Sequence, residues 1–344
     1  MTETKIQRNV PAAIGRAREL VLPTLRSAVD AIPDERMRLV AGYQLGWCEA
    51  DGTPVEGGGG KMIRPTLAVL SAEAAGGVSA DGVPGGVALE LVHNFSLLHD
   101  DIMDRDTERR HRPTGWVAFG EGQAILGGNA MLTAAVEVLM ANPACAPRTV
   151  PHLLSTVQHL ISGQSADLAL ERRPQVALDE VLDMEVGKTA ALLSCASSIG
   201  ALAAGAPPQV VDSLARYGHR MGLAFQLVDD VLGVTGDPSV TGKSASSDVR
   251  AGKRSAVVVA ALQAGTAESA QLAELLAAGP PEAEADVVRA TALIVDAGGV
   301  DWALAEADRL LTEALGCLDE VGPADDPAIA ELASVARYIV ARDR

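Results

Sequence analysis

The residues best placed to do chemistry are two groups of aspartates, each at the end of a long apolar stretch. The first group is Asp100, Asp101 and Asp104, and the second is Asp229 and Asp230. Carboxylates this close repel one another, and holding them beside apolar surface is costly. Mg²⁺ removes that cost because it prefers oxygen ligands and keeps coordination positions open to phosphate oxygens. The two groups therefore indicate a diphosphate held through metal ions.

Helical geometry distinguishes the members of the first group. Asp100 and Asp104 are four residues apart, so on a helix they share one face and can ligate one ion. Asp101 lies about 100° around the helix axis. The alternative is an exposed acidic helix end, but a helix C-terminus disfavours negative charge because its carbonyl groups already point outward. This placement favours a metal site.

Basic residues near these groups are candidate phosphate ligands. Arg109 and Arg110 follow the first group, and guanidinium groups make forked hydrogen bonds to phosphate oxygens. Lys188 interrupts an apolar helix, where a lysine that covers core surface with its stem is the alternative. The remaining candidates lie elsewhere along the chain: Lys61, Arg64, His93, Lys243 and Lys253. A core histidine and solvated loop lysines are the ordinary alternatives for the last three.

Helices must position these residues. Ala, Leu and Val dominate a chain of 344 residues that is 48% hydrophobic but only 3% aromatic, and strand-like alternation is scarce. Helices are predicted after Pro65 and over residues 9–31, 34–50, 86–104, 121–141, 148–171, 177–204, 208–233, 254–263, 282–297, 300–317 and 326–342. Charged and Gly- or Ser-rich loops are expected over residues 105–113 and 236–252. Most loops are short, which predicts an all-α protein: one large antiparallel helical bundle, a single domain over residues 1–344.

Charge and cysteine content limit the class of protein. Lys and Arg number 28 against 45 Asp and Glu, a formal charge of −17, which argues against nucleic acid as a partner. The four cysteines are far apart, so we expect reduced packing residues in a cytosolic protein. No signal peptide is recognised, and no apolar run reaches the ~18 uncharged residues of a membrane span. The expected protein is cytoplasmic and does not span a membrane.

Together these residues resemble the trans-isoprenyl diphosphate synthase family over nearly the whole chain, and within it the short-chain, actinobacterial-type geranylgeranyl diphosphate synthases. The matching segments are Gly60-Lys61-x-x-Arg64-Pro65, His93, Asp100-Asp101-x-x-Asp104, Arg109-Arg110, Lys188-Thr189, Phe225-Gln226, Asp229-Asp230, Thr241-Gly242-Lys243 and Gly252-Lys253. The resemblance implies an isoprenoid synthase fold, a homodimer of bundled helices in which both acidic motifs face one central cavity. It also implies a prenyltransferase that condenses isopentenyl diphosphate with an allylic diphosphate and uses a trinuclear Mg²⁺ cluster.

The resemblance assigns roles to individual residues. Asp100, Asp104 and Asp229 would ligate Mg²⁺, with Asp101 and Asp230 in support. The allylic diphosphate would be held by four basic residues, Arg109, Lys188, Lys243 and Lys253. Isopentenyl diphosphate would contact Lys61, Arg64, His93 and Arg110. Thr189 would bind substrate, and Gln226 would lie near the reacting carbons.

Three positions depart from the family pattern. Gly233 replaces the last acid of the second motif, which removes a supporting carboxylate. Met62 stands at a position that is often basic, and Asn129 stands where an aspartate is expected.

Product length is predicted from the helix that carries Asp100. Phe95 lies five residues earlier and Ser96 beside it is small, which places the ring about 7–8 Å deeper at a rise of ~1.5 Å per residue. By resemblance, a bulky residue at that depth limits the growing tail, and one aromatic with a small neighbour predicts a C20 product, geranylgeranyl diphosphate. C15 and C10 products follow closely. A Phe95 that faces a neighbouring helix would limit nothing.

Two other classes stay open. A class I terpene cyclase shares the metal chemistry, but Gly233 occupies the place of the hydroxyl residue in the triad that such cyclases carry. A non-catalytic partner subunit usually loses acidic residues, whereas five remain here. The predicted function is a trans-prenyltransferase whose catalytic residues are Asp100, Asp101, Asp104, Arg109, Lys188, Gln226, Asp229 and Asp230.

Overall fold

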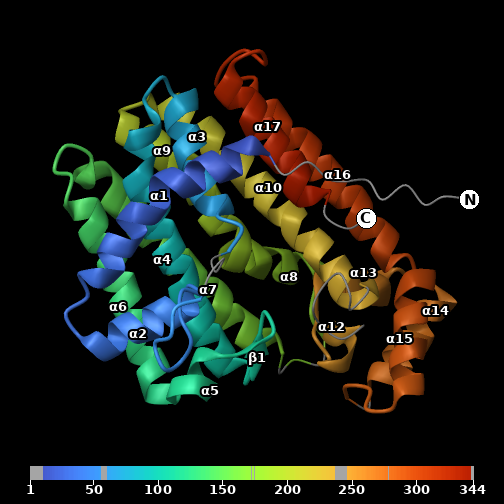
Figure 1. Cartoon of the computed structure of the whole chain (residues 1–344). Helices are drawn as coiled ribbons and strands as arrows, with labels where there is room; N and C mark the ends of the chain where they lie inside the picture. Colours follow the sequence, from blue (N-terminus) through green and yellow to red (C-terminus); the bar gives the residue numbers. More distant parts are fainter. Residues whose placement is uncertain are drawn as a thin grey trace, which may run out of the picture. The chain divides into compact units, whose positions relative to one another are not determined.

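The regular structure of the chain is almost entirely helical (Figure 1). The computed structural model describes residues 11–55, 60–171, 173, 175–236, 246–277 and 279–341. Within these ranges the extended elements are an isolated bridge between Cys48 and Pro54 and two short strands, β1 (Glu108–Arg109) and β2 (Arg112–Pro113). The strands pair antiparallel, with Arg109 opposite Arg112. The all-α prediction is confirmed.

The chain divides into two compact units. The first comprises Met1–Leu153, Cys195–Ala215 and Leu318–Ala341, and the second comprises Leu154–Ser194, Arg216–Cys317 and Arg342–Arg344. Four helices contribute residues to both units: α7 (Ala146–Leu170), α9 (Ala191–Ala204), α10 (Pro208–Thr235) and α16 (Gly299–Leu318). A single domain over residues 1–344 stays a prediction.

The first unit is built around α4, which carries the first acidic group. Its other elements are α1 (Ala12–Asp30), α2 (Glu35–Gln44), α3 (Ile63–Ala74), α5 (Gly115–Phe119), α6 (Glu121–Met140) and α17 (Pro327–Val340). Helix α4 (Ser79–Met103) packs against α3 and α6, and α1 contacts all three (Figure 1). A Cβ on Gly82 would lie 2.4 Å from the carbonyl oxygen of Ala68, so α3 and α4 meet backbone to backbone. This contact fixes the beginning of α4 against α3.

The second unit contains α8 (Leu178–Glu185), the π-helical turn η1 (Val186–Ala190), α12 (Ser247–Arg250), α13 (Ala256–Gln263), α14 (Ala267–Leu276) and α15 (Glu284–Asp296). Helices α13, α14 and α15 pack on one another around Val257, Leu272 and Ile294, which are at most 1% exposed. A Cβ on Gly163 would lie 2.4 Å from the backbone nitrogen of Lys188. Glycine is therefore required where α7 touches η1.

Some helix boundaries differ from prediction. Helix α2 ends at Gln44 rather than at residue 50, because Gly46 (φ 74°) leaves the helical region. Helix α4 begins at Ser79, earlier than residue 86. Helix α14 was not predicted, although the Thr266 side chain caps it by accepting a hydrogen bond from the backbone N–H of Ser269. The segment expected to be a charged loop contains the β1–β2 hairpin.

Two helical segments, Glu121–Met140 and Leu178–Ala204, are long and apolar enough to cross a membrane, although the sequence analysis expects none. The apolar windows of these segments are 39% and 56% buried. Because core helices of soluble proteins meet the same criteria of length and hydropathy, these segments are weak evidence for a span.

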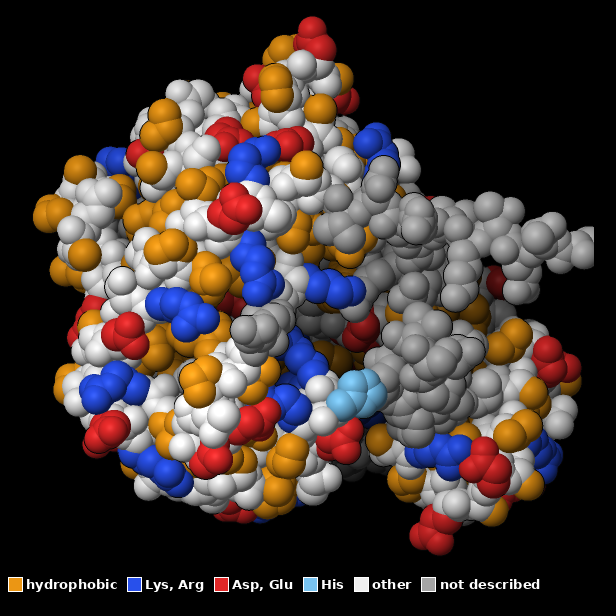
Figure 2. All heavy atoms as spheres, viewed as in Figure 1, with side chains coloured by type: hydrophobic (Ala, Val, Ile, Leu, Met, Phe, Trp, Pro, Cys, Tyr) orange, Lys and Arg blue, Asp and Glu red, His pale blue; other side chains and the backbone are white. Residues whose placement is uncertain are grey.

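Acidic and basic side chains are interspersed on the face shown in Figure 2, with hydrophobic side chains between them. The formal charge of −17 is thus not gathered into one acidic patch on the described part of this face. Binding of an anion depends on local placement of Lys and Arg rather than on net charge.

Candidate active site

The first acidic cluster, Asp100, Asp101 and Asp104, ends α4 and has one buried member. Asp101 is 1% exposed, whereas Asp100 and Asp104 are partly exposed. Oδ1 of Asp101 accepts a hydrogen bond from Nε of Arg109 at 2.6 Å, and Oδ2 is buried without a hydrogen-bond partner. Burial raises the pKa of Asp101, and the nearby Arg109 lowers it. Arg109 therefore holds Asp101 in the interior, whereas the side chains of Asp100 and Asp104 reach the surface.

The β1–β2 hairpin positions the arginines that follow this cluster. Arg109 lies on β1 and directs its guanidinium at Asp101. Arg110 and His111 form the turn with left-handed backbones, φ 54° and 60°. Arg109 was predicted to bind the allylic diphosphate; in the structure it is 29% exposed and forms an ion pair with Asp101.

Residues predicted to bind isopentenyl diphosphate gather around a buried carboxylate, Glu90 on α4, which is 5% exposed. Arg64 and Arg110 are its electrostatic partners. A Cβ on Gly60 would lie 3.6 Å from Nη2 of Arg110 and 3.8 Å from Oε1 of Glu90. We name Arg64, His93, Arg110 and Glu90 the anion pocket. Lys61, the fourth predicted ligand, is exposed.

The electrostatics of the anion pocket suit a polyanion. Burial lowers the pKa of Arg64 to about 10. Burial and the charges of Arg64 and Arg110 lower the pKa of His93 well below its ordinary value, so this imidazole is neutral. Burial raises the pKa of Glu90. Two guanidinium groups against one carboxylate leave a net positive site. Sequence reasoning missed Glu90, although it lies three residues before His93 and shares its helix face.

The second acidic cluster, Asp229 and Asp230 on α10, also has one buried member. Asp229 is exposed, and Asp230 is 5% exposed. Oδ1 of Asp230 accepts a hydrogen bond from Nε2 of Gln226 at 2.8 Å, and Oδ2 accepts one from the backbone N–H of Ala256 at 3.1 Å. Thr189 donates to Oε1 of Gln226 at 2.7 Å. This network fixes the amide of Gln226 and leaves Asp229 accessible to a metal ion.

A second missed residue, Glu185, lies beside Asp230 at the end of α8. It is 3% exposed and hydrogen-bonds Asp230, while its Oε2 is buried without a partner. Burial and the charge of Asp230 raise the pKa of Glu185 well above its ordinary value, and burial raises the pKa of Asp230 to about 6. Asp230 already accepts two other hydrogen bonds, so we assign the shared proton to Glu185. The sequence signal that could have identified Glu185 is its position as an acidic residue inside the apolar segment 177–204.

Lys188 and Thr189 lie on the π-helical turn η1. Lys188 forms an ion pair with Asp167 at 2.5 Å, and both side chains are partly exposed. Single π-helical turns are frequent at functional sites because they shift side chains out of the helical register. Lys253 is exposed in the loop after α12. Thr241, Gly242 and Lys243 lie outside the described residues.

The residues predicted to limit product length are buried on α4. Phe95 is 8% exposed, and its ring lies edge-on to His99, with ring centroids 4.8 Å apart and planes at 71°. Ser96 is 9% exposed and donates to the carbonyl oxygen of His93 at 2.8 Å. A Cβ on Gly128 of α6 would lie 2.4 Å from Nε2 of His99, so α6 holds this imidazole in place.

The three departures from the family pattern have different surroundings. Met62 is 5% exposed with φ 53° and precedes α3, so its side chain is an apolar core contact. Asn129 on α6 is exposed. At Gly233 a Cβ would lie 2.2 Å from Oδ2 of Asp248. The volume that an acidic side chain at position 233 would occupy is filled instead by the carboxylate of Asp248.

The carboxylates present fit Mg²⁺, which prefers hard oxygen ligands. In the ranges that the structure describes, no three His, Cys, Asp or Glu side chains form a group that could hold an ion alone. Bound diphosphate and water would therefore have to complete the coordination. Mg²⁺ commonly retains several waters and binds through one or two carboxylates together with substrate phosphates.

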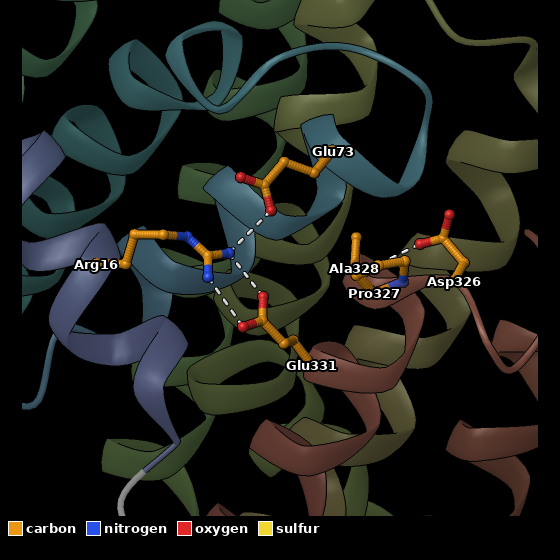
Figure 3. A pocket seen from close by; sticks show the side chains of 6 residues that line it. All are labelled: Arg16, Glu73, Asp326, Pro327, Ala328 and Glu331. Atoms are coloured by element: carbon orange, nitrogen blue, oxygen red, sulfur yellow. Dashed lines mark hydrogen bonds and ion pairs between the residues drawn. The ribbon is translucent and has the colours of Figure 1, made fainter.

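A surface pocket of about 650 Å³ lies elsewhere in the first unit, lined by Arg16, Glu73, Asp326, Pro327, Ala328 and Glu331 (Figure 3). Arg16 of α1 points between Glu73 of α3 and Glu331 of α17 and donates to them at 3.0 Å and 2.6 Å. None of the predicted site residues lines this pocket. Its polar groups bond one another, so it is an ion-pair junction of three helices.

An all-α chain with two aspartate clusters and two arginines beside a buried carboxylate has the side chains of an enzyme that handles diphosphate esters. The polyprenyl synthetase family profile matches residues 52–294. A (2E,6E)-farnesyl diphosphate synthase of Mycobacterium tuberculosis is 44% identical over 98% of this chain and 95% of its own. A geranylgeranyl diphosphate synthase of that organism is 42% identical over 94% and 95%.

Solved structures of the same family also resemble this chain. A polyprenyl synthetase from Streptomyces coelicolor superposes with a TM-score of 0.90 at 46% identity, covering 96% of this chain and 99% of that one. A geranylgeranyl pyrophosphate synthase from Corynebacterium glutamicum, complexed with isoprenyl diphosphate and magnesium, superposes with a TM-score of 0.83 at 27% identity over 97% and 99%. The chain belongs to the polyprenyl synthetase family. Within it, the chain is a short-chain trans-prenyltransferase.

Proposed function

We propose that the chain synthesises geranylgeranyl diphosphate from isopentenyl diphosphate and an allylic diphosphate. The relatives do not distinguish a C15 from a C20 product, because a farnesyl and a geranylgeranyl diphosphate synthase have nearly the same sequence identity to this chain, 44% and 42%. The observation that supports C20 is the pairing of a buried Phe95 with a small Ser96 on the helix that carries Asp100. A single bulky side chain at that depth leaves room for a longer tail than two would.

The proposed chemistry is ionisation of the allylic C–O bond followed by carbon–carbon bond formation. Mg²⁺, when bound, would neutralise the diphosphate and assist its departure. In the first unit Asp100 and Asp104 would ligate Mg²⁺, and in the second unit Asp229 would do so. Lys188, Lys253, Lys243 and Arg109 would hold the allylic diphosphate. The related Corynebacterium structure is complexed with magnesium and isoprenyl diphosphate, which supports the use of Mg²⁺ by this chain.

The chain's own residues orient the second substrate and protect the cation. Arg64, Arg110, His93 and Lys61 would bind isopentenyl diphosphate, whose double bond attacks the allylic carbon. The released pyrophosphate then takes the proton lost from the adjacent carbon. Gln226 is fixed by hydrogen bonds with Thr189 and Asp230, and its amide would lie near the reacting carbons. Apolar side chains around the growing tail exclude water, which would quench the cation.

We further propose a cytoplasmic homodimer. The test of function incubates purified protein with Mg²⁺, isopentenyl diphosphate and each of the C5, C10 and C15 primers, with products separated by chromatography. A C20 diphosphate as end product is the expected result. A C15 or C10 end product refutes the chain-length proposal, and a hydrocarbon would indicate a cyclase. No product without a second protein would indicate a partner subunit.

A further inference from the structure

The second acidic cluster contains one carboxylate more than its sequence motif shows. The family motif places an acid at position 233, and here that residue is glycine. In the structure, a Cβ at Gly233 would lie 2.2 Å from Oδ2 and 2.6 Å from Cγ of Asp248. Such distances are far below van der Waals contact, so the Asp248 carboxylate occupies the volume that a side chain at position 233 would need.

Helical geometry relates this carboxylate to Asp229. Positions 229 and 233 are four residues apart on α10, so they share one face, with Cβ positions about 5–6 Å apart. Because Asp248 fills the place of the missing side chain, its carboxylate lies on the face of α10 that carries Asp229, one turn further along. An acid at position 233 would project from the same place.

Asp248 is held on a short, anchored helix. The next residue, Val249, is 3% exposed in the core of the second unit, and Arg250 forms an ion pair with Glu284 of α15 at 2.6 Å. The backbone N–H of Lys253 donates to the carbonyl oxygen of Asp248 at 2.9 Å. The turn that carries Asp248 thus also fixes the start of the segment with Lys253, a proposed diphosphate ligand.

We propose that Asp248 replaces the missing acid at position 233 and supports the metal ion bound at Asp229. This inference rests on the proposed Mg²⁺-dependent function. The carboxylate comes from a different helix than the acid expected at position 233, and a side chain at that position would have to displace the Asp248 carboxylate. Asp248 accepts hydrogen bonds from metal-bound water or ligates the ion directly, and either contact raises affinity for a divalent cation.

The test measures binding of Mn²⁺, a spectroscopic substitute for Mg²⁺, by electron paramagnetic resonance in the presence of inorganic pyrophosphate. Asp248→Asn keeps the shape of the side chain and should weaken Mn²⁺ binding by about 10-fold or more, as loss of supporting groups around a metal typically does. The matched control is Asp296→Asn, an exposed acid at the end of α15 in the same unit, which should bind as wild type does.

A double variant moves the carboxylate back to α10. Asp248→Ala combined with Gly233→Asp removes the clash and restores an acid at position 233, so it should recover most of the affinity lost in Asp248→Ala. Mn²⁺ binding by Asp248→Asn equal to wild type overturns the role of Asp248 and leaves the proposed function intact. If wild type itself takes up no Mn²⁺ with pyrophosphate, the proposed function fails as well. Thermal unfolding of each metal-free variant confirms that the protein measured is folded.

Discussion

The buried pair Glu185–Asp230 makes the stability of the fold depend on pH in a way that one substitution should abolish. Glu185 is 3% exposed, and its pKa is raised well above the ordinary value of 4.5, chiefly by burial and then by the charge of Asp230. Glu185→Gln keeps a hydrogen-bond donor to Asp230 but cannot ionise. We expect this variant to be as folded as wild type at low pH and more stable than wild type at higher pH.

The sign and size follow from proton linkage. A carboxyl group whose pKa is higher in the fold than in the unfolded chain stabilises the fold fully below the unfolded pKa. That contribution is lost as pH rises through the folded-state pKa. Between those two values unfolding of wild type releases one proton, so its free energy of unfolding falls by about 1.4 kcal/mol per pH unit relative to Glu185→Gln.

The assay is urea unfolding of wild type and Glu185→Gln without metal or substrate at about pH 5, 6 and 7. The difference in unfolding free energy should grow as pH rises from about 5 and should level off once pH exceeds the raised pKa of Glu185. The control is Asp183→Asn, an exposed acid on the same helix α8, which should show the wild-type slope. Equal slopes for wild type and Glu185→Gln would mean that Glu185 is ionised in the fold, and the assignment of the shared proton to it would be wrong.

Three further outcomes are expected. Arg109→Ala removes the guanidinium that pairs with the carboxylate of Asp101, which is 1% exposed. The free energy of unfolding should fall by about 3–5 kcal/mol. An unchanged denaturation midpoint would contradict this prediction. Glu90→Gln removes the one negative charge of the anion pocket, so the site becomes more positive and KM for isopentenyl diphosphate should fall while KM for the allylic primer stays constant, measured by steady-state kinetics. Equal effects on both substrates would contradict a local role. Phe95→Ala should lengthen the product seen by chromatography, and unchanged length would exclude Phe95 as the floor.

The fold was largely predictable because most of its helices coincide with long apolar stretches that are separated by clear breaks in the sequence. The ends of α6, α7 and α10 fall within two residues of the predicted ranges. Helix α14 was missed because its sequence is short and its strongest signal is the single capping residue Thr266. The division into two units involves segments far apart in sequence, which no local pattern reports.

The site was predictable as a set of motifs, but the different environments of neighbouring aspartates were not. Sequence alone treats Asp100 and Asp101 as a pair, whereas burial and Arg109 separate them in the structure. Glu90 and Glu185 matter because of what packs around them, and those partners come from other elements. Gly233 is the clearest example. The sequence shows only that an expected acid is absent at this position, whereas the structure shows that the carboxylate of Asp248 lies there.

The ion-pair junction at Arg16 has a consequence for how the protein can be made. It ties a helix near the beginning of the chain to α17, which begins at Pro327, and both contact α3. The unit that carries the aspartates near residue 100 is therefore assembled from segments 315 residues apart in sequence. A ribosome must release α17 before that unit can close, and a clone truncated ahead of α17 would yield a chain in which α1 and α3 lack this helix as a partner.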